Sequence, residues 1–268
     1  HWNAAAVKLD EIRFLPITDQ ATEERMFRDG KLHVTDTVPP TKIAVYQQNN
    51  PGHIRIDPYL STYFYRINTT KPPLNDKRVR QALAMALDRP SIVKFVTKAG
   101  QLPALNLTPP GTAGYTCRAQ LNPSVAEAKK LLAAAGYPDG KGFPAVEILY
   151  NTQDTHRSVA ESIQQMWKQN LGIEVKLLNQ EWKVYLDSQR QLNYQICRAG
   201  WTGDYVDPNT FLDMWVTGGG NNLTGFSEPR YDELIRLAAR ELDPAKRRAF
   251  FHEAETILID RVIPICPV

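Results

Sequence analysis

The residues best suited to chemistry lie together in one short segment, 197–208, which reads Cys-Arg-Ala-Gly-Trp-Thr-Gly-Asp-Tyr-Val-Asp-Pro. Arg198 supplies a positive charge, Asp204 a negative charge and Trp201 a flat apolar wall. Glycines on both sides of the tryptophan would let the backbone of a ligand come close. Together these residues suit a zwitterionic ligand.

The same residues also allow an interpretation without a ligand. In that alternative Trp201 belongs to the core, Arg198 pairs with a surface acid and Asp204 only caps the turn that follows. For Asp207 a solvated or capping carboxylate is the simpler interpretation, because two acids three residues apart are common in loops. A hydrolase or transferase that uses Asp204, Asp207 and His156 is a competing hypothesis of a different class.

The motifs that an enzyme would need are missing. There is no Gly-x-Ser-x-Gly elbow, and the five histidines show no zinc-helix pairing. The glycines at 218–220 are followed by Asn221-Asn222, which indicates a turn and not a phosphate loop. Three widely spaced cysteines indicate neither a zinc site nor a dense disulfide framework, and Cys197 is predicted to be a buried thiol. We therefore expect no enzyme activity, no cofactor and no metal.

The composition is that of an ordinary globular protein. The 268 residues are 43% hydrophobic and 23% charged, enough for one large domain or one domain with part of a second. The 32 Lys and Arg are spread among 29 Asp and Glu without a basic block, so nucleic acid is not an expected partner. Apolar runs such as 82–87 are far shorter than the roughly 20 residues of a membrane span. The opening His1-Trp2-Asn3 leads us to expect a processed or truncated chain.

The first third of the chain is predicted to mix short strands with one helix. The expected elements are a strand at 7–17, a helix at 19–27, a strand pair at 42–46 and 53–56, and a buried strand at 62–67. The Pro-rich stretch 71–76 marks the start of a new unit. Asp76 is the expected N-cap of a helix that ends before Pro90.

The rest of the chain alternates strands with helices. Strands are expected at 146–150, 173–178 and 194–198, and helices at 123–135, 156–171, 182–189, 229–240 and 244–260, with a loop at 107–115 and a strand-like run at 263–268. This alternation predicts an α/β fold with a mostly parallel sheet. The segment 197–208 then follows the end of a strand, where ligands bind in open α/β sheets.

Several blocks carry a resemblance to a known family. The run Leu-Asn-Asp-Lys-Arg-Val-Arg-Gln-Ala at 74–82, continuing to Asp88-Arg89, resembles the signature of the family 5 bacterial extracellular solute-binding proteins. These are the oligopeptide- and dipeptide-binding components of ABC importers. Further blocks agree in order, at 127–136, 150–152, 179–183 and 198–204. The resemblance covers nearly the whole chain and is closest to the oligopeptide branch.

The resemblance implies a fold and a division into lobes. Members of the family are two-lobed clamps of roughly twice this length, of the periplasmic-binding-protein-like type II, cluster C fold. The lobe expected in this chain is α/β, with a mixed, mostly parallel sheet flanked by helices, and the two-lobed protein is expected to be truncated. By this likeness residues 1–57 are a fragment of the first lobe, 58–262 form the second, peptide-gripping lobe, and 263–268 start the strand that returns to the first lobe.

The resemblance also implies a ligand, partners and a location. The implied ligand contacts are Asp204 for the peptide's α-amino group, Trp201 and Trp182 as walls of side-chain pockets, Gly200 through backbone hydrogen bonds, and Arg198 and His156 for the peptide's carboxylate. The implied partners are short peptides, ABC permease subunits in the membrane and the missing first lobe. The implied location is periplasmic or extracellular, with a lipoprotein anchor as an alternative. A peptide sensor of the same fold is the alternative role.

Three departures from the family pattern concern the site. A disulfide of some enteric relatives would join the positions of Ser61 and Thr202, so it cannot form here. An arginine of the family that meets longer peptides is Gln189 in this chain, next to Arg190. Cys266-Pro267 replaces an aromatic run, which changes the last strand and its pocket tyrosine.

Overall fold

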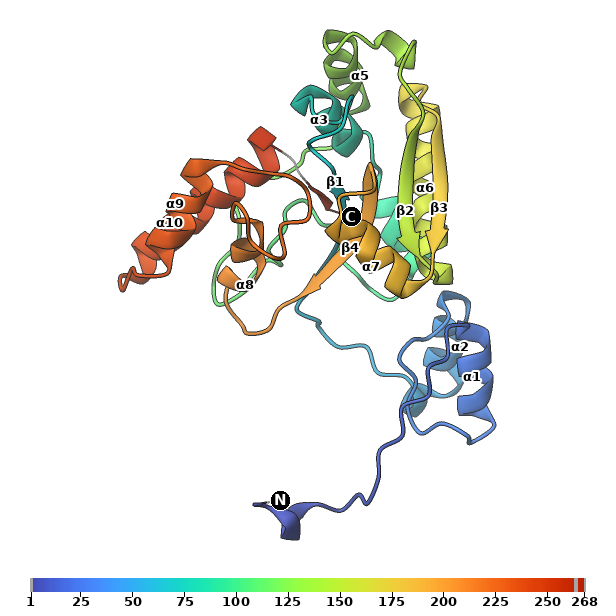
Figure 1. Ribbon diagram of the computed structural model, residues 1–268. Helices are drawn as coiled ribbons and strands as arrows, with labels where there is room; N and C mark the ends of the chain where they lie inside the picture. Colours follow the sequence, from blue (N-terminus) through green and yellow to red (C-terminus); the bar gives the residue numbers. More distant parts are fainter. Residues whose placement is uncertain (1, 263–264, 268) are drawn as a thin grey trace.

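A mixed sheet of five strands organises the computed structural model, which describes residues 2–262 and 265–267 (Figure 1). The strands are β1 (Ser61–Ile67), β2 (Val146–Asn151), β3 (Val175–Gln180), β4 (Ile196–Thr202) and β5 (Ile265–Pro267). Their order across the sheet is β3-β2-β4-β1-β5. β2 pairs in parallel with β3 and β4, whereas β1 is antiparallel to both β4 and β5. The predicted α/β class and mixed sheet are confirmed, and β1 is the strand that runs against the others.

Helices cover both faces of the sheet. The longer ones are α3 (Lys77–Met85), α5 (Val125–Ala134), α6 (Asp154–Leu171), α7 (Trp182–Arg190), α9 (Pro229–Ala238) and α10 (Pro244–Thr256). Ile148 of β2 packs in the main core with α6, while its neighbour Leu149 packs with Tyr185 of α7. Because successive side chains of a strand point to opposite faces, α6 and α7 lie on opposite sides of β2.

Polar contacts fix the helices around the main core. Asp76 and Ser124 accept backbone N–H bonds at the starts of α3 and α5, as expected for N-caps. The indole of Trp167 in α6 donates to the backbone oxygen of Leu83 in α3 over 2.8 Å. The Trp167 bond joins α3 to α6, the helix that packs against β2 and β3.

The predicted strand at 7–17 is wrong, although the segment is extended. Apart from a short 3₁₀ turn at Ala4–Ala6, the chain runs without strand pairing as far as Asp19, and the ring of Phe14 is 90% exposed. A strand requires a partner for its backbone groups, and no described strand lies beside this segment. The next prediction is confirmed, because α1 (Gln20–Arg28) begins after Asp19, whose carboxylate caps it.

The predicted strand pair at 42–46 and 53–56 is also wrong. Residues Pro40–Asn49 form α2, and Pro51–His53 form a 3₁₀ turn. Proline at the first helical position is preorganised for a helix, and Pro40 occupies that position in α2. In Figure 1, α1 and α2 lie side by side at one end of the molecule and connect to β1 through an extended stretch.

The remaining predicted elements appear within a few residues of their expected bounds, and two differences matter. β4 runs from Ile196 to Thr202 and not from 194 to 198, so Arg198, Gly200 and Trp201 lie on the strand itself. In the predicted final strand, residues 265–267 pair with β1, while 263, 264 and 268 lie outside the described residues.

Candidate ligand-binding site

The end of β4 holds Trp201 and Asp204 around one hydroxyl group. Thr210, which is 1% exposed, accepts a hydrogen bond from the Trp201 indole at 3.4 Å and another from the Asp204 backbone N–H at 3.1 Å. The Asp204 side chain itself is exposed. Sequence analysis missed Thr210, because only the fold places the short helix α8 (Asn209–Leu212) against the end of β4.

Gly200 and Gly203, on either side of Trp201, differ in how closely they are packed. The N–H of Gly203 donates to Leu60 O over 2.8 Å, and an added Cβ would lie 2.7 Å from the Leu60 side chain. A larger residue would therefore have to push the Leu60 side chain aside. Gly200 is exposed, and a Cβ there would meet Thr62 O at 3.5 Å and Arg198 Nη2 at 3.8 Å, both ordinary contacts. Packing within the chain does not require glycine at 200, and its backbone is open to a ligand.

Asp207 serves the fold and not a ligand. Its carboxylate receives two hydrogen bonds from the Arg247 guanidinium, at 2.6 and 2.9 Å, and accepts the backbone N–H of Asn209 at 2.9 Å. Burial alone would raise the pKa of Asp207, but the bonds from Arg247 and Asn209 outweigh it and the pKa is lowered. The capping interpretation of Asp207 is confirmed.

Arg198 stacks on an aromatic ring and has no acidic partner among the described side chains. Its guanidinium carbon lies 4.9 Å from the centroid of the Tyr63 ring, and its Nη1 donates to Asn151 Oδ1 over 3.3 Å. The Arg198 Nε is buried without a hydrogen-bond partner. None of the described carboxylates forms an ion pair with Arg198, so the alternative in which it pairs with a surface acid does not hold.

His156 lies beside this group in an uncharged state. It sits in the first turns of α6, is 7% exposed, and its Nδ1 is 3.3 Å from the Tyr63 hydroxyl. Burial, followed by the positive charge of Arg198, lowers the pKa of His156 to about 3. At neutral pH the imidazole is therefore a neutral hydrogen-bonding group.

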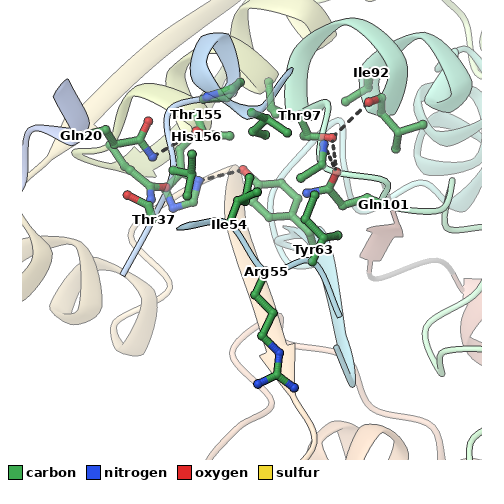
Figure 2. A pocket seen from close by; sticks show the side chains of 18 residues that line it. Gln20, Thr37, Ile54, Arg55, Tyr63, Ile92, Thr97, Gln101, Thr155 and His156 are labelled. Atoms are coloured by element: carbon green, nitrogen blue, oxygen red, sulfur yellow. Dashed lines mark hydrogen bonds between the residues drawn. The ribbon is translucent and has the colours of Figure 1, made fainter. Parts of the chain in front are cut away.

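A cavity of about 360 Å³ opens beside Tyr63 and His156, and its walls come from residues 20–56, from residues 92–101 and from the start of α6 (Figure 2). Figure 2 shows the Tyr63–His156 contact between two polar groups of side chains, Gln20 with Thr155 on one side and Thr97 with Gln101 on the other. The apolar lining consists of Val38, Pro40, Ile43, Ile54, Ile56, Ile92, Val93, Ala99 and Val159. This mixture of mostly apolar walls and a few polar groups is typical of small-molecule sites.

Trp182 presents a half-open aromatic face at the start of α7. It is 51% exposed and stacks on Tyr185 with ring centroids 5.5 Å apart and an interplanar angle of 22°. The Tyr185 hydroxyl donates in turn to the backbone oxygen of Arg198. This contact ties the start of α7 to the strand that carries the candidate site.

Of the six site residues predicted from the sequence, four form two pairs and two lie apart. Arg198 and His156 meet around Tyr63, Trp201 and Asp204 meet around Thr210, Gly200 lies between these groups on β4, and Trp182 stands on α7. Of the residues in the competing hydrolase hypothesis, His156 contacts Tyr63, and Asp207 contacts Arg247.

Metal binding and membrane spanning find no support in the part of the chain that the structure describes. No three His, Cys, Asp or Glu side chains there are grouped so that they could hold a metal ion. None of the helices in these residues has the length and hydropathy to cross a membrane.

Further positions named in the sequence analysis lie on β1, β4 and α7. Ser61 and Thr202 are register partners in β1 and β4, and their hydroxyl oxygens are 3.4 Å apart. Cys197 is a free, buried thiol, as predicted. Gln189 is buried, and its side-chain oxygen accepts a hydrogen bond from Arg66.

Comparison with known sequences gives one consistent family. The profile described as bacterial extracellular solute-binding proteins, family 5 Middle, matches residues 1–223. The periplasmic murein peptide-binding protein MppA of Escherichia coli is 37% identical over 277 residues, covering 100% of this chain and 51% of that protein. The periplasmic oligopeptide-binding protein OppA of Escherichia coli is 37% identical over 279 residues, covering 100% of this chain and 50% of that protein. The chain spans about half the length of these relatives.

Solved structures agree with the sequence matches. The Escherichia coli murein tripeptide-binding protein MppA superposes with a TM-score of 0.90 at 37% identity, over 95% of this chain and 51% of that chain. An oligopeptide-binding protein from Borrelia burgdorferi also gives a TM-score of 0.90, at 36% identity, over 100% of this chain and 53% of that chain. The chain belongs to the family 5 bacterial extracellular solute-binding proteins.

Proposed function

We propose that this chain is the peptide-gripping part of a two-lobed, periplasmic peptide-binding protein that delivers short peptides to an ABC importer. In this proposal residues 58–262 form the gripping lobe, 1–57 are a fragment of the first lobe, and 263–268 begin the strand that returns to it. The relatives' names, which state murein-peptide and oligopeptide binding, support short peptides as ligands. The permease subunits of the importer and the remainder of the first lobe are the proposed partners.

The observation that carries the proposal is the placement of two opposite charges on one strand and its loop. Asp204 offers an exposed carboxylate, and Arg198, six residues earlier, a guanidinium that no carboxylate in the described part of the chain pairs with. Six extended residues span at most about 20 Å, and an extended peptide advances roughly 3.3–3.6 Å per residue. The side chains of Asp204 and Arg198 occupy part of this distance. The remaining distance fits a peptide of three to five residues whose ammonium meets Asp204 and whose carboxylate meets Arg198.

The other proposed contacts bind what all peptides share. The exposed backbone of Gly200 would pair with the peptide main chain, while Trp201 and Trp182 would form apolar walls for side chains. His156 would donate a neutral hydrogen bond to the peptide carboxylate beside Arg198. Such backbone-directed binding would tolerate many peptide sequences.

The test is calorimetry on the two-lobed protein with mixed tri- to pentapeptides. Asp204→Asn is expected to weaken binding by about 2–5 kcal/mol, because it removes the partner of the peptide ammonium. N-acetylated peptides, which lack the ammonium, should bind the unchanged protein weakly. Asp204→Asn should reduce their affinity little further. Asp187→Asn, the same change at an exposed acid of α7, is the matched control and should leave binding unchanged. Absence of peptide binding, or equal binding by the Asp204 variant, would refute the proposal.

A further inference from the structure

Arg66 of β1 is a buried arginine that points toward α7. It is 6% exposed and lies opposite Cys197 in the β1–β4 register. Its guanidinium donates to the side-chain oxygen of Gln189 and, over 3.5 Å, to the backbone oxygen of Asn221. The Arg66 Nε is buried and makes no hydrogen bond.

No negative charge compensates Arg66 among the side chains that the structure describes. None of their carboxylates forms an ion pair with it. Burial raises the pKa of the Cys197 thiol to about 12, and it also raises the pKa of the Tyr185 and Tyr194 hydroxyls. All three neighbours are therefore neutral, and a buried cation in neutral surroundings is costly for the free protein.

The cation belongs to the same face of α7 as a proposed wall of the peptide site. Trp182, Tyr185 and Gln189 are spaced three and four residues apart, which places them on one side of the helix. Trp182 and Gln189 are seven residues apart, roughly 10 Å along the helix axis. Trp182 is exposed at the outer end of this stripe, and Gln189 holds Arg66 at its buried inner end. A peptide side chain that lies along Trp182 would therefore extend toward Arg66.

We propose that Arg66, held by Gln189, binds the carboxylate of an acidic side chain of the bound peptide. The inference rests on the proposed function, in which Asp204 receives the ammonium and Arg198 the terminal carboxylate of the peptide. With both peptide termini paired, Arg66 still lacks a counter-charge, and the carboxylate of an acidic peptide side chain supplies one. The planar guanidinium, with an unused Nε donor, suits a carboxylate that accepts two hydrogen bonds.

The first arm of the test measures the peptide preference by calorimetry on the two-lobed protein. Tetra-alanine is the host, and Glu, Gln and Lys are placed in turn at each of its positions. At one position Glu should bind about 10- to 100-fold more tightly than Gln, which is the range of a charge-assisted hydrogen bond, and Lys should bind more weakly than Gln. Tight binding of tetra-alanine with equal affinities for Glu and Gln at every position would overturn the inference and leave the proposed function intact. Absence of binding by every peptide would overturn both.

The second arm uses variants to distinguish a ligand-binding Arg66 from one that only stabilises the fold. It measures the Glu preference and the unfolding midpoint of each variant. Arg66→Met should abolish the Glu preference, keep the affinity for tetra-alanine, and leave the unfolding midpoint equal or higher, because it removes an uncompensated buried charge. Gln189→Glu should give Arg66 an internal carboxylate, which raises the unfolding midpoint and also removes the preference. The matched control is Arg80→Met, which replaces a buried arginine whose Nη1 donates to Leu74 O and Asn75 O, and it should leave the preference unchanged. If Arg66→Met lowers the midpoint and the Glu preference persists, Arg66 is a structural residue and the inference is wrong.

Discussion

Thr210 shows how single residues position the proposed contacts. Its hydroxyl accepts one hydrogen bond from the Trp201 indole and one from the Asp204 backbone, so one side chain fixes an aromatic wall and a charge together. Around Tyr63, the ring carries the Arg198 guanidinium while the hydroxyl contacts His156. In both groups a residue with no proposed ligand contact sets the geometry of two that have one.

Replacing Thr210 with valine tests this arrangement. Valine keeps the shape of the side chain but leaves both donors without an acceptor, so we expect a loss of about 1–3 kcal/mol in the free energy of unfolding and weaker peptide binding. Thr210→Ser keeps the hydroxyl and should retain peptide affinity. Denaturant unfolding and calorimetry measure the two effects, and equal peptide affinities of the Val and Ser variants would contradict the positioning role.

His156 makes a prediction about pH. Its pKa is lowered from 6.5 to about 3 in the folded protein, so the unfolded chain binds the proton first as pH falls. Above pH 6.5 the imidazole is neutral in both the folded and the unfolded state, so it does not affect stability. As pH falls from about 6 to 3, the free energy of unfolding should decrease by up to about 1.4 kcal/mol per pH unit.

Urea unfolding at a series of pH values, with His156→Gln for comparison, isolates this contribution. The titration of carboxylates is common to both proteins, so it cancels in the difference. The variant should show a shallower loss of stability below pH 6. Parallel curves for the two proteins would mean that His156 is not neutral in the folded state.

At the scale of elements, two glycines join α6 to the turn before β2. Gly140, in the 3₁₀ turn Pro138–Gly140, has a φ of +75°, and an added Cβ would lie 2.5 Å from Leu171 O. Gly172, which ends α6, has a φ of +69°, and its added Cβ would lie 2.5 Å from Asp139 O. The two backbone segments therefore approach too closely for a side chain at position 140 or position 172.

Gly172→Ala should destabilise the protein by more than a conformational penalty alone. We expect at least about 2 kcal/mol, since the left-handed backbone and the close contact both oppose the Cβ. Gly142→Ala is the matched control, because Gly142 has a φ of +74° but nothing within 4 Å of an added Cβ, and it should cost about 1 kcal/mol. Thermal unfolding compares them, and equal losses would show that the contact itself contributes nothing.

Elements were predictable where local pattern and tertiary context agreed. The helix at 154–171 carries an apolar stripe and ends at a glycine, so its periodicity was sufficient to identify it. The segment 7–17 has strand periodicity, but a strand also needs a neighbour, which no local pattern supplies. Likewise Asp204 and Arg198 could be proposed from their spacing, whereas Arg66 meets Gln189 from 123 residues away and became visible only in the fold.

At the scale of the whole molecule, the N-terminal segment leaves apolar side chains uncovered. Leu9 is 67% exposed, Ile12 66% and Phe14 90%, all in an extended run without strand pairing. Such a run offers both an apolar surface and unpaired backbone groups to another chain.

We therefore expect the 268-residue chain to self-associate. Light scattering over a range of protein concentrations should show dimers or larger species, and removal of residues 1–17 should shift them toward monomer. The triple change Leu9→Ser, Ile12→Ser and Phe14→Ser should act in the same direction. A clean monomer at high concentration would contradict the expectation.

The neighbouring hydroxyls of Ser61 and Thr202 have a practical consequence for making and handling the protein. Neither position is a cysteine, and a 3.4 Å contact between two hydroxyl oxygens joins β1 to β4 there. This end of the sheet therefore needs no oxidation step to reach its final form. Reductant in a purification buffer, or synthesis in a reducing host, should leave the proposed peptide-binding end of β4 intact.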